Sequence, residues 1–353
     1  MSLHTTALPL SPALTRHGVT AAWAYSVDLT TRFRGITTRE GVLLAGPGGW
    51  GEFSPFWDYP PAECVPWWRA ALAAARGELA PATHAQVPVN VTIPAVPAAA
   101  VEQIAAAHPG VAAAKVKVAE PGHCLADECA RLAAVRAALP AADIRIDANG
   151  AWSVDEALDK LPPLQAAAGG LAYVEQPCRT VAELAAVRAA GICPVAADES
   201  IRRAADPHAV ARAQAADYIV IKAQPLGGSL AAAALAAGVG LPAVVSSALE
   251  TSVGLAQGYA LACALADAEG LSSPRPAGLG TRSLLTGDVV EVPLAPRAGA
   301  LHRADLPTSA QVSAGVERAA RLDADLAARW SQRLAAVLAV GGQAAAASGN
   351  FPS

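Results

Sequence analysis

Lysine is scarce in this sequence. Of the 26 basic residues only four are lysine, namely Lys115, Lys117, Lys160 and Lys222. On a surface, arginine supplies positive charge as well as lysine does, but only lysine, when desolvated, can give up its proton near neutral pH. The lysines that are present are therefore candidates for chemistry.

Basic clusters and long apolar runs are also missing. The formal net charge is −4 and no run of lysine or arginine occurs, which argues against a nucleic acid or an acidic membrane as partner. The longest apolar stretches, such as residues 230–239, are shorter than the ~20 residues that cross a bilayer. With 53% apolar residues the chain can bury a large core. We expect a globular protein with a small-molecule substrate and no implied protein partner, so that a monomer is compatible with the sequence.

Sequence features of secretion are absent as well. The six cysteines form no C-x-x-C pair, and the first ten residues lack the basic segment of a signal peptide. Both absences favour a cytoplasmic location and free thiols.

The sequence does contain a regular alternation of short β-rich runs with alanine-rich helical stretches, such as residues 127–139 and 181–190. This pattern is typical of repeated βα units around a parallel sheet. Successive strand ends lie 23 to 30 residues apart, which suits one strand and one helix per unit. The predicted strands are residues 87–93, 114–118, 144–147, 172–175, 195–198, 218–222 and 243–246, with a weak eighth at 277–280.

Three domains or segments follow from this pattern. Residues 86–281 form the predicted (β/α) barrel, and residues 1–85 read as a separate α+β capping domain. Residues 282–353 are expected to return to the cap and to end in a loose tail over the last dozen residues. Outside the barrel, the predicted strands are residues 21–30, 41–45 and 289–292, and the predicted helices are residues 63–78 and 313–340.

Three acidic residues, Asp147, Glu175 and Asp198, stand where predicted strands end. In a (β/α) barrel the C-terminal strand ends form the active-site face. Three carboxylates converging there would repel one another unless a cation lay between them, and hard oxygen ligands with room for water select Mg²⁺ or Mn²⁺. Taken singly, each has a plainer explanation: a turn or helix cap for Asp147, an ion pair for Glu175, and a helix cap for Asp198. Their shared position and regular spacing favour the metal site.

The lysines occupy similar positions. Lys115 and Lys117 are two residues apart on a predicted strand, so both point into the barrel. Two like charges side by side lower each other's pKa, which lets a lysine near a metal act as a base. The alternative is an exposed edge strand decorated with charge, and it loses weight in a protein with four lysines.

Lys222 ends the apolar run Tyr-Ile-Val-Ile-Lys, four strands after Lys117, and is expected to lie across the barrel mouth from it. The alternative is a structural lysine whose stem is buried along apolar surface. Ser246 and Ser247, and then Glu250-Thr251-Ser252, follow the next strand and offer hydroxyl and backbone N–H donors suited to a carboxylate, although helix capping by these residues is equally open.

These motifs occur in a characteristic order: Lys-x-Lys, Asp-Ala-Asn-Gly-Ala-Trp, Glu-Gln-Pro, Asp-Glu-Ser, Ile-Lys and Ser-Ser-Ala-Leu-Glu-Thr-Ser. The set resembles the muconate-lactonizing branch of the enolase superfamily and, within it, is most similar to the o-succinylbenzoate synthases. The resemblance covers residues ~20 to ~285. It implies an α/β fold: a (β/α) barrel of the enolase type, that is a modified TIM barrel, with an α+β capping domain.

The resemblance also implies roles for individual residues. Asp147, Glu175 and Asp198 would bind Mg²⁺ (or Mn²⁺), Lys117 would be the catalytic base, and Lys222 would stand opposite it as the second catalytic residue. The implied substrate-binding residues are Lys115, Arg145 of the Arg-x-Asp pattern, Asn149, Ser246 and Ser247.

In this family the capping domain supplies specificity loops, which correspond here to residues 31–37 and 48–58. The resemblance implies that residues in and next to these loops face the substrate. They are Arg34, Gly35, Phe53, Phe56, Trp57 and Tyr59.

The reaction implied is removal of the proton α to a carboxylate, giving an enediolate, followed by loss of a β-hydroxyl as water. This is the syn dehydration of 2-succinyl-6-hydroxy-2,4-cyclohexadiene-1-carboxylate to 2-succinylbenzoate in menaquinone biosynthesis. The Pro-Ala-Gly-Leu-Gly-Thr segment at 276–281 lacks the Asp-x-Asp of dipeptide epimerases. N-succinylamino acid racemase remains the enzymatic alternative because it uses the same two lysines, while a catalytically dead binding barrel is disfavoured by their retention.

Overall fold

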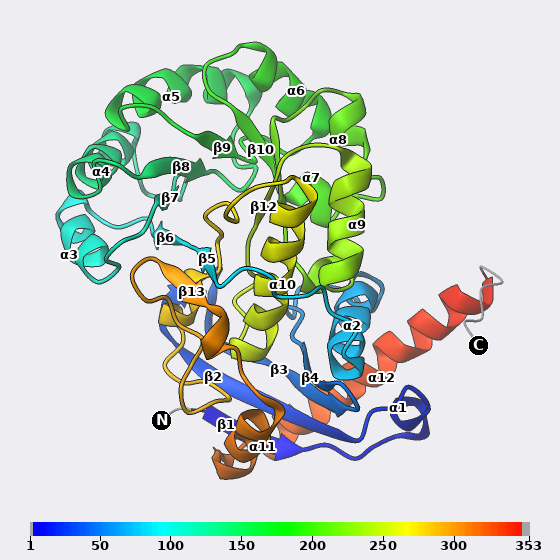
Figure 1. Ribbon diagram of the computed structural model, residues 1–353. Coiled ribbons are helices and arrows are strands. Elements are labelled where there is room, and N and C mark those ends of the chain that lie inside the picture. Colours follow the sequence, from blue (N-terminus) through cyan, green and yellow to red (C-terminus); the bar gives the residue numbers. More distant parts are fainter. Residues whose placement is uncertain (1–2, 348–353) are drawn as a thin grey trace.

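The computed structural model describes residues 3–347, with residues 342–347 described by their backbone only. Two layers are evident in Figure 1: a curled parallel sheet jacketed by helices, and a twisted, mostly antiparallel sheet with helices beside it. We call them the barrel and the cap. Among the described residues no helix is long and apolar enough to cross a membrane.

The barrel is a seven-stranded parallel sheet in the order β12-β11-β10-β9-β8-β7-β6. Two isolated parallel bridges, Val89 to Ala277 and Ser246 to Gly278, join its two edges through residues 277–278 and close the barrel. A side chain at Gly278 would not fit, because its Cβ would lie 2.6 Å from Ser246 Oγ. The strands are β6 (Asn90–Ile93), β7 (Ala113–Lys117), β8 (Asp143–Asp147), β9 (Tyr173–Glu175), β10 (Val195–Ala197), β11 (Tyr218–Ile221) and β12 (Ala243–Val245).

Alternation along the strands separates two environments. On β8, Ile144 and Ile146 are fully buried in the main barrel core, whereas Arg145 and Asp147 take the opposite parity and point inward. A small second core, made by Tyr173, Val220 and two further residues of inward parity, fills the barrel interior. The polar inward residues therefore stand above an apolar plug, at the carboxyl ends of the strands.

Helices follow each strand as the sequence predicts. Several begin at a capping box, for example α5 at Ser153 with Glu156 and α6 at Thr180 with Glu183. The barrel helices are α3 (Val101–Ala106), α4 (Leu125–Ala138), α5 (Val154–Ala167), α6 (Val181–Ala189), α7 (Glu199–Arg202), α8 (Ala209–Arg212), α9 (Ser229–Val239) and α10 (Ser252–Ala268).

The cap is a five-stranded sheet in the order β14-β1-β2-β3-β4, packed against α2 (Pro61–Arg76) and α12 (Ala324–Ala347). Trp67 of α2 and Trp330 of α12 are almost completely buried in its core, which thus combines the two ends of the chain. Its strands are β1 (Leu3–Ala7), β2 (Ala21–Phe33), β3 (Ile36–Gly46), β4 (Gly49–Phe53) and β14 (Ala320–Arg321).

A buried polar junction joins the cap to the barrel. Glu52 of β4 accepts hydrogen bonds from Tyr25 Oη (2.7 Å) and from the Thr251 and Gly254 amides at the start of α10. Arg39 of β3 donates to the carbonyl of Leu249, in the loop after β12. Because these groups are buried and paired, the cap is held in a fixed position relative to the barrel mouth.

The (β/α) barrel with its α+β cap is thus confirmed, but two predictions for the C-terminal segment are wrong. Residues 289–292 form no strand. Val289 and Val290 are buried there against α11 (Ser309–Arg318), whose Gly315 packs so closely on the Val289 carbonyl that no strand partner fits.

The single helix predicted at 313–340 is two helices, α11 and α12. The break arises because Ala320 and Arg321 pair with β1 and because Asp323 accepts the Asp325 and Leu326 amides, at 3.0 Å each, which starts α12. Of the predicted loose tail, residues 348–353 lie outside the described residues.

Candidate active site

Strand register brings the predicted site residues to one level of the barrel. Lys117 pairs with Asp147 across β7 and β8, and Asp147 pairs with Glu175 across β8 and β9. Asp198 directly follows β10 and Lys222 directly follows β11. The five side chains therefore gather at the mouth because their strands end together, as the sequence predicts.

The first group of residues, on β7, β8 and β9, is here called the β7–β9 flank. Lys115 Nζ lies 3.0 Å from Asp147 Oδ2 and 3.2 Å from Glu175 Oε1, so one ammonium bridges two carboxylates. Lys117 Nζ donates to Asp147 Oδ2 and to Asn149 Oδ1, both at 2.6 Å. These two hydrogen bonds hold Lys117 at the barrel mouth. The side-chain oxygen of Asn149 is paired with Lys117 in this arrangement.

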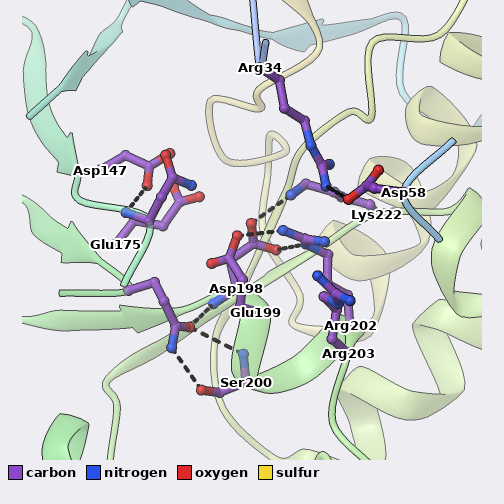
Figure 2. Close-up of polar contacts among 12 residues, drawn as sticks. Arg34, Asp58, Asp147, Glu175, Asp198, Glu199, Ser200, Arg202, Arg203 and Lys222 are labelled. Atoms are coloured by element: carbon purple, nitrogen blue, oxygen red, sulfur yellow. Dashed lines mark hydrogen bonds and ion pairs between the residues drawn. The ribbon is translucent and has the colours of Figure 1, made fainter. Parts of the chain in front are cut away.

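The second group, the β10–β11 flank, is built around one carboxylate. Asp198 accepts from Lys222 Nζ at 2.6 Å through one oxygen and from Arg202 Nε at 3.0 Å through the other. Arg202 also pairs with Glu199. Figure 2 shows this cluster beside the Asp147 and Glu175 side chains.

Burial and charge shift the pKa values of this site in opposite directions. Burial raises the pKa of Asp147, but Lys115 and Lys117 outweigh it and hold that pKa well below the ordinary value. Lys222 and Arg202 likewise outweigh burial and lower the pKa of Asp198. For Glu175, burial and the Asp147 charge prevail over Lys115 and raise the pKa to about 7.

The expected lowering of lysine pKa values by mutual repulsion is wrong for Lys115. Burial opposes its charge, but the carboxylates of Asp147 and Glu175 lie within ion-pair distance and raise the pKa of Lys115 well above the ordinary value. Lys115 is therefore a fixed cation in this arrangement, and a role in orienting an anionic group suits it better than proton transfer.

The arrangement of oxygen ligands bears on the predicted metal. Within residues 3–347 no three His, Cys, Asp or Glu side chains lie close enough together to hold a metal ion in the conformation described. Two of the three predicted ligands, Asp147 and Glu175, are brought together by the Lys115 ammonium, which occupies the position where positive charge is needed. All three carboxylates are 1% exposed, and the Asp198 charge acts on Glu175. Hard, buried oxygen donors of this kind fit Mg²⁺ chemistry.

Arg145 makes its polar contact inside the barrel, and its role in binding substrate stays a prediction. Its guanidinium donates to the Pro276 carbonyl at 2.7 Å, on the far side of the barrel, and stands 5.1 Å from the Tyr173 ring centroid. It is 3% exposed, and its Nε has no partner among the described residues. These contacts are those of a residue that supports the floor of the site, beneath Lys115 and Asp147.

Ser246 and Ser247 follow β12, where the barrel closes. Ser246 forms the bridge to Gly278, and Ser247 Oγ lies 2.8 Å from Thr281 Oγ1. Neither side chain caps α10, whose N-cap is Thr251. The alternative of helix capping, open for Ser246, Ser247 and the segment 250–252, is confirmed at Thr251, whose hydroxyl accepts the Val253 amide. The role of Ser246 and Ser247 in binding substrate stays a prediction.

The predicted cap residues divide into two sets. Arg34 stacks over the Phe56 ring at 4.0 Å and donates to Tyr59 Oη at 3.1 Å, and Tyr59 Oη also accepts from Arg202. Figure 2 shows Arg34 near Arg202. Phe53, by contrast, is fully buried in the cap core, and Trp57 contacts Trp330 of α12. That these two residues face the substrate stays a prediction.

Several supporting residues were missed by the sequence reasoning. Arg202 is one, although its position four residues after Asp198, on one helix face, was a usable signal. Gln176 is another: its Oε1 accepts the Asp198 and Ser200 amides, which ties the ends of β9 and β10 together. Arg131 of α4 donates to the Lys117 carbonyl at 3.0 Å, a contact that no local pattern reveals.

Backbone strain is concentrated at the same strand ends. Ala119, Asn149, Gln176 and Leu249 have φ values of 61°, 48°, 39° and 66°, in the left-handed region that non-glycine residues rarely adopt. Such strain persists where the surrounding structure enforces it, and it commonly marks functional sites.

Comparison with protein families agrees with this geometry. Residues 98–310 match the family described as "Enolase C-terminal domain-like", and residues 24–75 match "Enolase N-terminal domain-like". The chain is 50% identical over 317 residues to the o-succinylbenzoate synthase of Thermobifida fusca, which covers 90% of this chain and 95% of that protein. It is 49% identical over 266 residues to the o-succinylbenzoate synthase of Mycolicibacterium smegmatis, with 75% and 80% covered.

Solved structures show the same fold at lower identity. A dipeptide epimerase from Enterococcus faecalis, complexed with Mg and the dipeptide L-Leu-L-Tyr, is similar with a TM-score of 0.67 and 20% identity, covering 88% of this chain and 99% of that chain. The L-Ala-D/L-Glu epimerase from Bacillus subtilis has a TM-score of 0.65 and 21% identity, with 87% and 96% covered. On the matched domains and the sequence identity, the chain belongs to the o-succinylbenzoate synthase family of the enolase superfamily.

Proposed function

We propose that this protein is an o-succinylbenzoate synthase, a hydro-lyase that converts 2-succinyl-6-hydroxy-2,4-cyclohexadiene-1-carboxylate to 2-succinylbenzoate in menaquinone biosynthesis. The observation that carries the proposal is the pair Lys117 and Lys222, four strands apart at the same end of the barrel and each held by a carboxylate. The names of relatives about half identical to this chain support it.

The chain's own residues account for the proton transfers. Lys117 Nζ, held by Asp147 and Asn149, removes the proton α to the substrate carboxylate. Lys222 stays protonated and stabilises the negative charge of the enediolate from the other side. The bond to the β-hydroxyl then breaks, Lys117 returns its proton to the departing hydroxyl, and water leaves on the face from which the proton came.

The three carboxylates Asp147, Glu175 and Asp198 are the residues that would hold Mg²⁺ or Mn²⁺. When bound, the ion supplies the electrostatic stabilisation that makes so weak a carbon acid reactive. Lys115, which pairs with Asp147 and Glu175 in the structure, would be the cation available to the substrate carboxylate.

Charge at the mouth supports this assignment. Four basic and four acidic side chains meet there, and their charges balance when all are ionised, Glu175 with its pKa of about 7 included: Lys115, Lys117, Arg202 and Lys222 against Asp147, Glu175, Asp198 and Glu199. The proposed substrate carries two carboxylates and the metal carries two positive charges. The balance is kept when both bind together, and buried charge without a counter-charge is costly when either binds alone.

A second candidate, N-succinylamino acid racemase, is favoured by the same pair of lysines, because racemisation needs a proton donor and an acceptor on opposite faces. One assay separates the two. Purified protein with Mg²⁺ is given the cyclohexadiene carboxylate and, in D₂O, N-succinyl amino acids. We expect fast formation of 2-succinylbenzoate and slow or no α-deuterium incorporation. A higher kcat/KM for racemisation would overturn the synthase proposal.

We also propose a cytoplasmic location. All six cysteines are free thiols in the structure, and four of them are buried. Thiols that stay reduced are typical of cytoplasmic proteins.

A further inference from the structure

The loop at residues 54–60 stands between the C-terminal helix α12 and the active site. It follows β4 and precedes α2. Its Phe56 and Pro60 carbonyls accept the Tyr59 and Glu63 amides, but no backbone amide of the described residues donates to the Trp57 or Tyr59 carbonyl. Such carbonyls need donors from elsewhere when they are shielded from water. The side chains that supply these donors therefore hold the loop in place.

One side chain of α12 supplies them. Arg333 Nη2 donates to the Phe56 carbonyl at 2.7 Å and to the Tyr59 carbonyl at 2.9 Å, and Nη1 lies 3.4 Å from the Trp57 carbonyl. Its guanidinium also stands 4.7 Å from the Trp57 ring centroid. The fork of donors on arginine allows this multiple contact, which lysine could not reproduce. Arg333 thus holds both ends of the Phe56 to Tyr59 turn from outside the barrel.

The inner side of the same loop reaches the β10–β11 flank. Tyr59 Oη accepts a hydrogen bond from Arg202 Nη1 at 2.6 Å and another from Arg34 Nη2 at 3.1 Å. Arg202 in turn donates to Asp198, which holds Lys222. Figure 2 shows Arg34, Arg202, Asp198 and Lys222 converging at this place.

From this unbroken series of contacts we propose that Arg333 is a positioning residue for the active site. It fixes the 54–60 loop, and Tyr59 transmits that position through Arg202 to the Asp198 and Lys222 pair. A helix more than 100 residues beyond Lys222 in the chain therefore sets how tightly substrate is held and how Lys222 is aimed. The inference extends the proposed function, because the affected step is binding of the dicarboxylate at the barrel mouth.

Two variants test the two ends of this series. Arg333→Met keeps an unbranched side chain on Trp57 but removes all donors to the loop, whereas Tyr59→Phe keeps the ring packing and removes only the hydroxyl. We expect each to raise KM for the proposed substrate about tenfold with kcat changed less than about threefold, since lost positioning contacts appear mainly in binding. Arg333→Lys, which retains one donor, should restore part of the affinity.

The matched control is Arg329→Met on the same helix. Arg329 also stands over the Trp57 ring, at 4.5 Å, but it is exposed and makes no hydrogen bond to the loop within the part of the chain described. Its KM should match that of the wild type. If Arg329→Met raised KM as much as Arg333→Met, the effect would come from packing on Trp57 and the positioning role would be refuted.

The double variant decides whether the contacts act in series. If they do, Arg333→Met combined with Tyr59→Phe has a KM within about twofold of that of Arg333→Met alone, because the second change removes a contact already lost. If the increase in KM of the double variant equalled the product of the two single increases, the contacts would be independent and the coupling would be refuted.

A readout without substrate separates this inference from the proposed function. Hydrogen exchange of the Mg²⁺-loaded protein should show faster exchange of amides in residues 54–60 for Arg333→Met and unchanged exchange in β7 and β8. Unchanged exchange in the loop would overturn the positioning role even if the enzyme is a synthase. Faster exchange in a protein that does not dehydrate the cyclohexadiene carboxylate would instead retain the positioning role and reject the proposed function.

Discussion

The two flanks of the active site hold their lysines in different ways. On the β7–β9 flank, two lysines face two carboxylates and every one of these contacts is made among the barrel strands β7, β8 and β9. On the β10–β11 flank, Lys222 shares the single carboxylate of Asp198 with Arg202, and Arg202 continues to Tyr59 of the cap. One flank is internal to the barrel, and the other is connected to a second domain.

This difference matches the work proposed for each lysine. A base must be placed within fractions of an ångström of the proton that it removes, and rigid strands provide that precision better than loops do. A lysine that only presents positive charge tolerates a support that includes a loop. Coupling to the cap also lets substrate under the loop influence Lys222 while the base stays fixed. The predictions below test this division, beginning with the ion that would join the two flanks.

Removal of divalent metal should have the largest effect. The predicted ligands come from both flanks, since Asp147 and Glu175 belong to one and Asp198 to the other, so chelation leaves only the charge of Lys222 to stabilise the enediolate. Turnover should fall to background with EDTA and return with Mg²⁺ or Mn²⁺. Glu175→Gln should be inactive at any Mg²⁺ concentration in the assay. Full activity after exhaustive chelation would exclude a metal site formed by ligands from both flanks.

Lys117→Arg should have the next largest effect. Arginine keeps the charge and can still pair with Asp147, so the fold should survive, but it holds its proton at any working pH. We expect kcat to fall by about 10³-fold, within the 10²- to 10⁴-fold range of general-base catalysis. Lys160→Arg, on the exposed pair with Glu156 of α5, is the matched control and should leave kcat unchanged. If kcat of Lys117→Arg were within tenfold of the wild-type kcat, Lys117 would not be the base.

The same substitution at Lys222 should have a much smaller effect. If Lys222 only supplies positive charge, Lys222→Arg keeps that charge beside Asp198 and should lower kcat about tenfold through altered geometry. The ratio of kcat for Lys222→Arg to kcat for Lys117→Arg therefore measures the difference between the flanks directly. Equal losses of kcat would mean that both lysines move protons, as in a racemase, and the division between them would fail.

The same two flanks show what could be predicted from the sequence. The β7–β9 flank follows from alternation and strand ends, because a two-residue period places Lys115 and Lys117 on one face and parallel register places Asp147 beside them. Its residues were all predicted. What the pattern could not show is that Lys115 lies between two carboxylates and has a raised pKa, because that depends on distances of about 3 Å.

The β10–β11 flank was predicted only in part. Asp198 and Lys222 follow from strand ends, but the contact of Arg202 with Tyr59 spans 143 residues and that of Arg333 with the Phe56 carbonyl spans 277. No local periodicity carries such information. The C-terminal strand and helix failed for a similar reason, since Gly315 on Val289 and the pairing of β14 with β1 are tertiary contacts that override local propensity.

The smallest predicted effect concerns Glu250, in the junction that holds the cap against the barrel mouth. Burial, together with the nearby Glu52 charge, prevails over Arg39 and raises the pKa of Glu250 to about 7 from an ordinary 4.5. The folded protein therefore binds this proton more tightly than the unfolded chain does. Its stabilising contribution is present below about pH 4.5 and is lost as the pH rises through about 7.

Glu250→Gln mimics the protonated form at every pH and should remove this dependence. Between pH 5 and pH 8 the free energy of unfolding of the wild type should fall relative to that of Glu250→Gln by up to about 3 kcal/mol, the value of a shift of this size. Urea unfolding of both proteins at the two pH values measures the double difference, in which groups common to both cancel. A wild type that gains stability relative to the variant as the pH rises would show that Glu250 is ionised in the folded protein. The junction would then be an ion-paired contact like the β10–β11 flank, and cap and barrel would be coupled by charge at both places.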